Sequence, residues 1–218
     1  MPNEKERITV RLYWLSAILP ALLAASPALS APGLVLGDSI GVGVSLASGV
    51  KRLAHNSVTI GREDILGQIA QVPAGTIAFV SLGTNDAVGS IKGVGPRVDK
   101  VLAAVEAAGI TAVWIGPACV IQPWNSTVDE LDKLLSDKLA GRMAYVSIAD
   151  ANFCDSSIRG ADGVHFTFAG YKRIWSVAVA AAGVEIDVSV DAPAAFKAVH
   201  KAAHKIKKHK KKKLRRHR

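Results

Sequence analysis

Residues 33–41 read GLVLGDSIG, an apolar run that stops abruptly at a Gly-Asp-Ser tripeptide. Such a run is typical of a buried strand, and the residues after it are compatible with a helix. Gly37 can adopt backbone angles closed to other residues, so the chain can turn sharply there. Ser39 would then lie in the first turn of the next helix, where unpaired amides stabilise negative charge. The stretch favours a nucleophilic serine, although capping of the helix by Asp38 or Ser39 explains the same pattern.

Three familiar motifs can be compared with this stretch. Residues 37–41 formally match the G-x-S-x-G elbow of α/β-hydrolases, but that serine follows several strands and here none precede it. In chymotrypsin-like enzymes His and Asp precede the serine, whereas the first histidine of this chain is His55. The dinucleotide-binding fingerprint also fails, because Leu46 stands where its third glycine belongs. What remains is a serine that comes first, with its partners downstream.

Strand-like and helix-like segments alternate along the rest of the chain. The apolar spacing predicts further strands at 57–60, 76–82, 111–115 and 144–148. Helices are predicted at 39–53, 62–70, 94–108 and 167–182, with one more that Ser126 or Thr127 caps and that runs to Leu139. This alternation indicates a three-layer α/β/α sandwich with a five-stranded parallel sheet, in which ligands bind at the carboxyl ends of the strands.

The polar residues suited to chemistry follow the ends of these strands. Ser39 follows the first strand, Gly61 the second and Asn85 the third. Asp162 and His165 come after the fifth. Because parallel strands end at the same edge of a sheet, all five residues should converge there. Taken singly, Asn85 and Asp162 would be read as ordinary turn residues, so it is the joint placement that indicates a site.

Together these residues resemble the signature blocks of the SGNH hydrolases, also called GDSL esterases. The blocks are matched in order by Gly37-Asp38-Ser39, Gly61, Gly83-Thr84-Asn85-Asp86 and Asp162-Gly163-Val164-His165. The resemblance covers roughly 34–175; Ile40 stands where the family usually has leucine, and of block two only the glycine fits. It implies a flavodoxin-like SGNH hydrolase fold and a serine esterase.

Ester hydrolysis would give each of these residues a task. Ser39 Oγ would attack the ester carbonyl while His165 takes its proton and returns it to the leaving alcohol. Asp162, three residues before His165 on one turn, would fix the tautomer of the imidazole. The resemblance assigns the oxyanion hole to the backbone amides of Ser39 and Gly61 and to the side-chain amide of Asn85.

The substrate is expected to be a small-molecule, lipid or polysaccharide ester. We expect an O-acyl ester, of the O-acetyl kind, on an envelope or extracellular carbohydrate, because no lid or wide acyl pocket is visible in the sequence. Lysophospholipase, thioesterase or O-acyltransferase activity fits the same residues, and a non-catalytic envelope-binding module is the alternative from another class. No metal-ligand cluster, phosphate loop or paired glycosidase carboxylates occur in the sequence, so no cofactor and no metal is implied.

An apolar loop at 117–125 is longer than a simple strand-to-helix connection requires. Its Trp124 is either a substrate contact or loop packing. The loop also contains Cys119, one of only two cysteines; the other, Cys154, follows the fifth predicted strand. Segments after neighbouring parallel strands emerge at one edge, so the two are predicted either to bridge beside the site or to be separate buried thiols.

The first 30 residues resemble an export signal. Three basic residues within the first eleven precede the apolar run 12–25, which is short for a membrane span. Ala28 and Ser30 are small residues at the −3 and −1 positions of a cleavage site. We therefore expect a signal peptide at 1–30, an exported hydrolase domain at 31–190, and an uncleaved anchor as the alternative.

Residues 191–218 are a basic tail. Lys197 to Arg218 hold 12 of the 27 Lys and Arg and none of the 18 acids, which leaves 15 basic against 18 acidic residues, a charge of −3, for 1–196 of a chain whose total is +9. So many like charges cannot form a core. The tail is expected either to attach to an anionic envelope or membrane surface or to be a solubilising end. Export argues against nucleic acid as the partner, and we expect a monomer.

Overall fold

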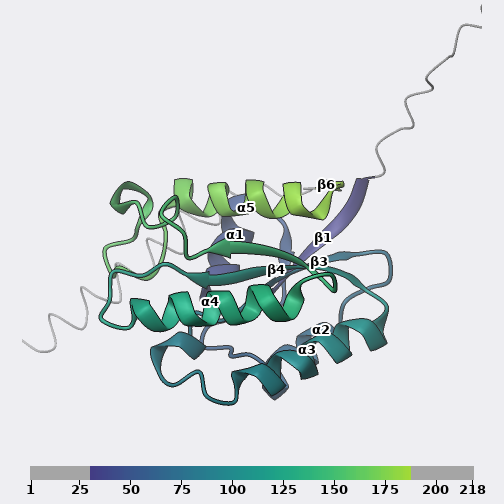
Figure 1. Cartoon of the computed structure of the whole chain (residues 1–218). Coiled ribbons are helices and arrows are strands. Elements are labelled where there is room, and N and C mark those ends of the chain that lie inside the picture. The colour runs from purple at the N-terminus through teal and green to yellow at the C-terminus, as the bar shows by residue number, and fades with distance from the viewer. Residues whose placement is uncertain (1–29, 188–218) are drawn as a thin grey trace, which may run out of the picture.

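The apolar run that ends at Gly37 forms strand β1, which pairs with three other strands (Figure 1). The computed structural model describes residues 30–187. Its sheet is parallel in the order β2-β1-β3-β4-β5, and a short sixth strand, β6, pairs with the start of β1. The strands are β1 (Ser30–Gly37), β2 (Lys51–Arg52), β3 (Ile77–Ser81), β4 (Thr111–Ala118), β5 (Ala144–Ile148) and β6 (Glu185–Asp187). The predicted five-stranded sheet is confirmed, with β6 as an addition.

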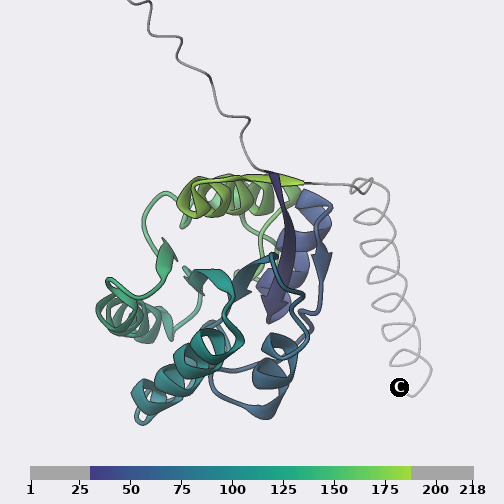
Figure 2. The ribbon, with the colours of Figure 1, turned by 90° about the vertical axis from the view of Figure 1, so that its right-hand side faces the viewer.

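Helices cover both faces of this sheet, as Figures 1 and 2 show. Helices α1 (Ser39–Ser48) and α5 (Phe168–Ala182) pack against each other on one face. The other face carries α2 (Glu63–Ile69), α3 (Val94–Ala108) and α4 (Asn125–Leu139). Two short 3₁₀ helices, η1 (Asp86–Val88) and η2 (Ser156–Ile158), lie in the loops. The three-layer α/β/α sandwich predicted from the alternation is therefore confirmed.

The strands are apolar on both sides because each side faces a core. Leu36, Val80 and Trp114 point towards α2, α3 and α4, while Val35 and Phe79 point towards α1 and α5. All five side chains are fully buried. This two-sided burial explains why the strands were recognisable as continuous apolar runs rather than as alternating patterns.

The second strand lies elsewhere than predicted. Residues 57–60 form a loop in which Ser57 has a φ of 66°, and β2 lies earlier, at Lys51–Arg52. Helix α1 correspondingly ends at Ser48, not near Leu53. The prediction was wrong because Val58 and Ile60 are both fully buried, so a loop that contributes to the core has the apolar content of a strand.

The remaining elements lie close to their predicted bounds. Helix α3 and strand β5 have the predicted ends, and Gly109 closes α3 with a φ of 62°. Helix α4 begins at Asn125, with Trp124 in the cap position, so neither Ser126 nor Thr127 caps it. The Asn125 side chain instead accepts a hydrogen bond from the Val120 amide at 2.9 Å, which ties the start of α4 to the preceding loop.

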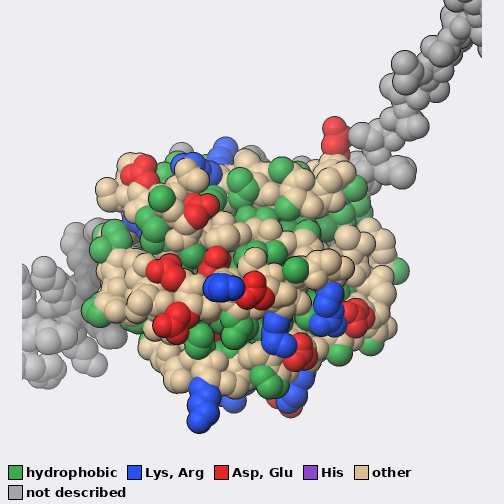
Figure 3. Space-filling view, in the orientation of Figure 1, with side chains coloured by type: hydrophobic (Ala, Val, Ile, Leu, Met, Phe, Trp, Pro, Cys, Tyr) green, Lys and Arg blue, Asp and Glu red, His purple; other side chains and the backbone are tan. Residues whose placement is uncertain are grey.

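The face over α4 carries acidic and basic side chains side by side (Figure 3). Three ion pairs lie on α3, α4 and the loop after α4: Lys133–Asp137, Lys138–Asp99 and Arg142–Glu106. Within residues 30–187, no helix has the length and apolar character needed to cross a bilayer. The predicted signal peptide, apart from Ser30 in β1, and the basic tail lie outside the described residues.

Candidate active site

The turn after β1 places Ser39 at the start of α1. Gly37 has a φ of 105°, and a side chain there would overlap the carbonyl oxygen of Ser81 on the neighbouring strand β3. The Gly37 amide donates to Oε1 of the buried Gln68 at 2.6 Å, and the Asp38 amide donates to the Ser81 carbonyl at 3.0 Å. Only glycine fits this close approach, so the turn is fixed by the backbone of two adjacent strands.

Asp38 caps α1 rather than taking part in proton transfer. Its Oδ1 accepts hydrogen bonds from the amide of Ile40 at 3.0 Å and from Ser81 Oγ at 3.2 Å. The side chain is fully buried, and this burial raises its pKa to about 7 despite those bonds. The cap bypasses the Ser39 amide, which donates to no acceptor in the described part of the chain. That amide is therefore free to bind a substrate oxygen.

Ser39, His165 and Asp162 form one chain of hydrogen bonds. His165 Nε2 lies 2.9 Å from Ser39 Oγ, and His165 Nδ1 lies 2.7 Å from Asp162 Oδ2. Ser39 and His165 are 126 residues apart in sequence, so the tertiary fold brings them together. The His165 and Asp162 side chains are 40% and 51% exposed. These two side chains are therefore accessible from solvent.

The carboxylate of Asp162 contacts both the imidazole ring of His165 and the backbone of the turn that carries it. Oδ1 accepts from the backbone amides of Val164 at 3.0 Å and of His165 at 2.9 Å, while Oδ2 faces the ring. Partial burial opposes ionisation, but these hydrogen bonds outweigh it and lower the pKa of Asp162 to about 2. With an ionised acceptor at Nδ1, the ring keeps its proton there and presents a lone pair at Nε2 to the serine.

The block-three residues hold the loop that contains Gly61. Asn85 Nδ2 donates to the Val58 carbonyl at 3.0 Å, and the Ile60 amide donates to both oxygens of Asp86 at 3.1 and 3.3 Å. Arg97 adds an ion pair to Asp86 at 3.1 Å. Burial raises the pKa of Asp86, and the bond from Ile60 and the charge of Arg97 act against that rise.

Two donors in this region are left for an oxyanion. Asn85 Nδ2 carries a second hydrogen beyond the one given to Val58. Gly61 has a φ of 67°, and its amide makes no hydrogen bond within residues 30–187. Together with the amide of Ser39, these are the groups that the resemblance assigned to the oxyanion hole, and that role stays a prediction.

The loop after β4 is tied to the turn that carries His165. The Ile121 amide donates to the Gly163 carbonyl at 2.7 Å, and Gln122 Nε2 donates to the Asp162 carbonyl at 2.9 Å. The structure joins Cys119 to Cys154 in a disulfide, so the bridging alternative holds here. Sequence reasoning noted the length of this loop but found no signal for Gln122, because its contact lies 40 residues away.

Trp124 lies in the same loop and is half-buried. It packs against the core beneath α2, α3 and α4 and occupies the cap position of α4. Loop packing thus accounts for its position, and its contact with a substrate stays a prediction. Residues 30–187 contain no group of three or more His, Cys, Asp or Glu side chains placed to hold a metal ion.

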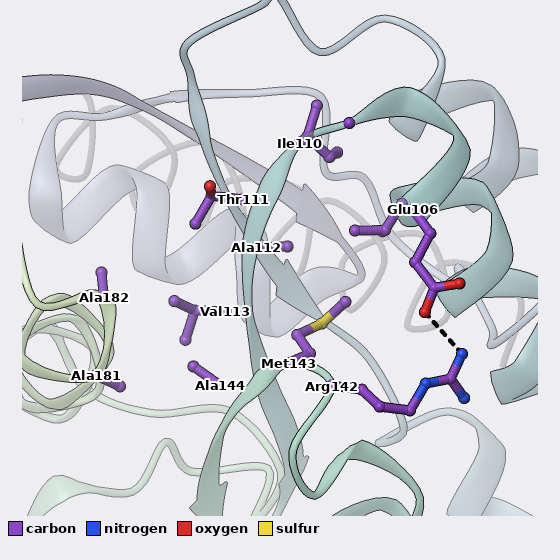
Figure 4. Close-up of a pocket in the computed structure, with 12 residues that line it drawn as sticks. Glu106, Ile110, Thr111, Ala112, Val113, Arg142, Met143, Ala144, Ala181 and Ala182 are labelled. Atoms are coloured by element: carbon purple, nitrogen blue, oxygen red, sulfur yellow. Dashed lines mark hydrogen bonds and ion pairs between the residues drawn. The ribbon is translucent and has the colours of Figure 1, made fainter.

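A cavity of about 360 Å³ lies at the opposite end of the strands (Figure 4). Its walls come from the amino ends of β4 and β5 and the carboxyl ends of α3 and α5, and the Glu106–Arg142 ion pair lies at its rim. None of the residues predicted to form the site lines this cavity.

No protein-family model and no curated protein matches the chain. Among solved structures, it is similar to a Desulfitobacterium hafniense protein assigned to the lipolytic G-D-S-L family, with 14% identity and a TM-score of 0.56 over 70% of this chain and 99% of that one. It is also similar to the inhibitor-bound aryl esterase of M. smegmatis, with 13% identity and a TM-score of 0.53 over 71% of this chain and 100% of that one. The OSK domain of Drosophila Oskar matches with 13% identity and a TM-score of 0.53 over 67% of this chain and 86% of that one. The chain therefore has the fold of the SGNH hydrolases.

Proposed function

We propose that this chain is a serine esterase of the SGNH type that hydrolyses O-acyl esters through a covalent acyl-enzyme. The observation that carries the proposal is the unbroken chain of hydrogen bonds from Ser39 through His165 to Asp162, at 2.9 and 2.7 Å. A serine, a base within hydrogen-bond reach and a group that orients the base are the three parts that activate a hydroxyl nucleophile.

The reaction follows from the placement of these atoms. As Ser39 Oγ bonds to the ester carbonyl carbon, its proton passes to His165 Nε2 and the carbonyl electrons move onto oxygen. The tetrahedral oxyanion then collapses, the bond to the alcohol oxygen breaks, and His165 returns the proton to that oxygen. Water repeats the two steps on the acyl-serine and releases the acid. Asp162 stays ionised throughout and stabilises the imidazolium.

The oxyanion would form beside the amino end of α1. There the unpaired Ser39 amide and the positive end of the helix dipole favour negative charge. The second hydrogen of Asn85 and the amide of Gly61 would complete the set of donors. The contacts of Asp86 and Asn85 to the Val58–Ile60 backbone support this, because they fix the Gly61 loop before substrate arrives.

For the substrate we propose an O-acyl ester, of the O-acetyl kind, carried on an envelope or extracellular carbohydrate. The exposure of His165 and Asp162 supports this, since an open site suits a short acyl group presented on a large chain. The apolar side chain of Ile121, which is 59% exposed and adjoins the His165 turn, favours a second candidate class with longer acyl chains, lysophospholipase or thioesterase.

We also propose that the protein is exported, as its first 30 residues suggest. The disulfide between Cys119 and Cys154 supports export, because cytosolic thiols are kept reduced. The basic tail would then attach the enzyme to an anionic envelope or membrane surface. Removal of residues 207–218 should weaken binding to anionic lipid vesicles at low salt and leave turnover of a small soluble ester unchanged. Equal binding by both forms would contradict this role of the tail.

The central experiment is turnover of p-nitrophenyl acetate by the full chain and by Ser39→Ala. We expect the substitution to lower kcat on the order of 10⁴-fold or more, because it removes the nucleophile. Equal rates for the two proteins would reject the esterase and favour the envelope-binding module. Acetyl, butyryl and octanoyl p-nitrophenyl esters then separate the two substrate classes, since kcat/KM should fall with acyl length for the first and rise for the second.

A further inference from the structure

Arg159 is a buried cation that makes no ion pair within residues 30–187. The residue is only 6% exposed. Two of its donor atoms, Nε and Nη2, are buried without a hydrogen-bond partner in the described chain. Burial lowers its pKa to about 10, so it keeps its charge near neutral pH. A buried charge without an ion pair is unfavourable, although the nearby charge of Asp162 acts in its favour.

The contacts that Arg159 does make lie on both sides of His165. Its Nη1 donates to the carbonyl of Val164 at 2.9 Å. Its guanidinium carbon lies 4.0 Å from the centre of the Phe166 ring, a cation–π contact. The backbones of Arg159 and Phe166 also pair as an antiparallel bridge. One side chain thus contacts the residues immediately before and after the histidine.

The backbone between them closes into a tight loop. The Gly160 amide donates to the His165 carbonyl at 2.6 Å, and the Gly163 amide donates to the Gly160 carbonyl at 3.0 Å. The Thr167 amide closes the base of the loop on the Ile158 carbonyl at 2.8 Å. The loop is also held by the Ile121 and Gln122 contacts already described and by the bond from Arg159 Nη1 to the Val164 carbonyl.

We propose that Arg159 is a positioning residue that fixes the His165 turn from inside the protein, so that Nε2 stays within hydrogen-bond distance of Ser39. The inference rests on the proposed esterase function. Without the bond from Nη1, the Val164 carbonyl loses its side-chain donor, and without the cation the Phe166 ring loses its stacking partner. Both losses free the segment that carries His165. A displacement of about 1 Å at a catalytic group can lower a rate on the order of 100-fold.

The test compares Arg159→Met, Arg159→Lys and Arg173→Met in the full chain. Methionine removes the charge and the donors, whereas lysine keeps the charge and one donor group. Arg173 is the matched control, because it is exposed and lies 5.4 Å from the centre of another aromatic ring, that of Phe153. We expect Arg159→Met to lower kcat for p-nitrophenyl acetate by about 10- to 100-fold with KM within about twofold. Lysine should restore much of kcat, and Arg173→Met should match the unchanged protein.

A second readout does not depend on turnover. The proton between His165 Nδ1 and Asp162 should give a downfield ¹H NMR signal, which Arg159→Met should shift or broaden and Arg173→Met should leave intact. If Arg159→Met does not fold, Phe166→Leu removes the aromatic ring that stacks on Arg159 but keeps an apolar side chain. This variant should lower kcat by several-fold. A folded variant of either kind with unchanged kcat and an unchanged signal would overturn the proposal. Absence of turnover by the unchanged protein, with a signal that still responds to Arg159, would reject the esterase and retain the positioning role.

Discussion

The two ends of the parallel strands carry different features: a hydrogen-bonded group of polar side chains at one end and a cavity with an ion pair at the other. At the carboxyl ends, Ser39, His165 and Asp162 are joined by hydrogen bonds of 2.9 and 2.7 Å. At the amino ends of β4 and β5 lies the cavity of about 360 Å³, whose charged groups are the Glu106–Arg142 pair at 2.7 Å. This cavity is thus separate from the end where Ser39, His165 and Asp162 converge.

The two ends differ in how far the protein controls the charge state of their side chains. The Glu106 and Arg142 side chains are 58% and 42% exposed, so water screens their charges. At the carboxyl ends, by contrast, the protein sets the protonation of its groups: the pKa of Asp162 is lowered to about 2 and that of buried Asp38 is raised to about 7. Groups with shifted pKa values beside a serine that lies within hydrogen-bond distance of a histidine indicate a candidate functional site.

Apart from loss of the nucleophile, the largest effect on activity is expected from removing a proposed oxyanion donor. Asn85→Ala should lower kcat for p-nitrophenyl acetate on the order of 100- to 1,000-fold, because one donor to the developing charge is lost. Thr111→Ala, which alters the cavity wall at the other end, is the control and should leave kcat unchanged. Asn85→Asp should lose at least as much as Asn85→Ala, since it puts a carboxylate beside the oxyanion. Retention of more than half of kcat by Asn85→Ala would contradict the assignment.

A smaller effect is expected from the disulfide beside the site. Reduction should add two hydrogens to the mass of the intact protein, as the Cys119–Cys154 bond requires. The bond closes a loop with a sequence separation of 35, so the Cys119→Ser/Cys154→Ser variant should lose about 2–4 kcal/mol in free energy of unfolding. Urea unfolding of the oxidised protein and of the variant measures this. Identical masses under both conditions, or identical midpoints, would count against the bond.

The buried carboxyl of Asp38 should make stability depend on pH. In the unfolded chain this carboxyl titrates near pH ~3.9, whereas burial raises its pKa to about 7 in the folded protein. Between these values the folded state holds a proton that the unfolded state has released. The free energy of unfolding should therefore fall as pH rises from about 4 to about 7, by up to ~1.4 kcal/mol per pH unit from this group.

Asp38→Asn isolates that contribution. Asparagine keeps an oxygen for the Ile40 amide but cannot ionise, so the variant should lose this part of the slope. Urea unfolding of both proteins at about pH 5 and about pH 8 gives the comparison. Parallel changes in the two proteins between these pH values would show that Asp38 titrates near its ordinary pKa and is already ionised throughout this range.

Much of the carboxyl-end site could be predicted because the order of strands and helices determines which residues lie at that edge of the sheet. Once strands and helices alternate, residues such as Ser39 and His165 must meet at one edge, however far apart they lie in sequence. The second strand was misplaced because Val58 and Ile60 are buried in a loop. Apolar residues indicate burial, and burial does not distinguish a strand from a buried loop. Arg159 was missed for a related reason, since sequence spacing does not reveal that a cation is buried against Phe166.

The smallest effect is expected at the cavity end. Glu106→Gln and Arg142→Gln each break the exposed ion pair and should change the free energy of unfolding by less than about 1 kcal/mol, because solvent screens both charges. Neither should change kcat, since the pair lies at the amino ends of the strands, away from Ser39. If either variant altered kcat several-fold while its unfolding midpoint stayed the same, the two ends of the sheet would be energetically coupled, and the cavity would have to be counted as part of the functional machinery.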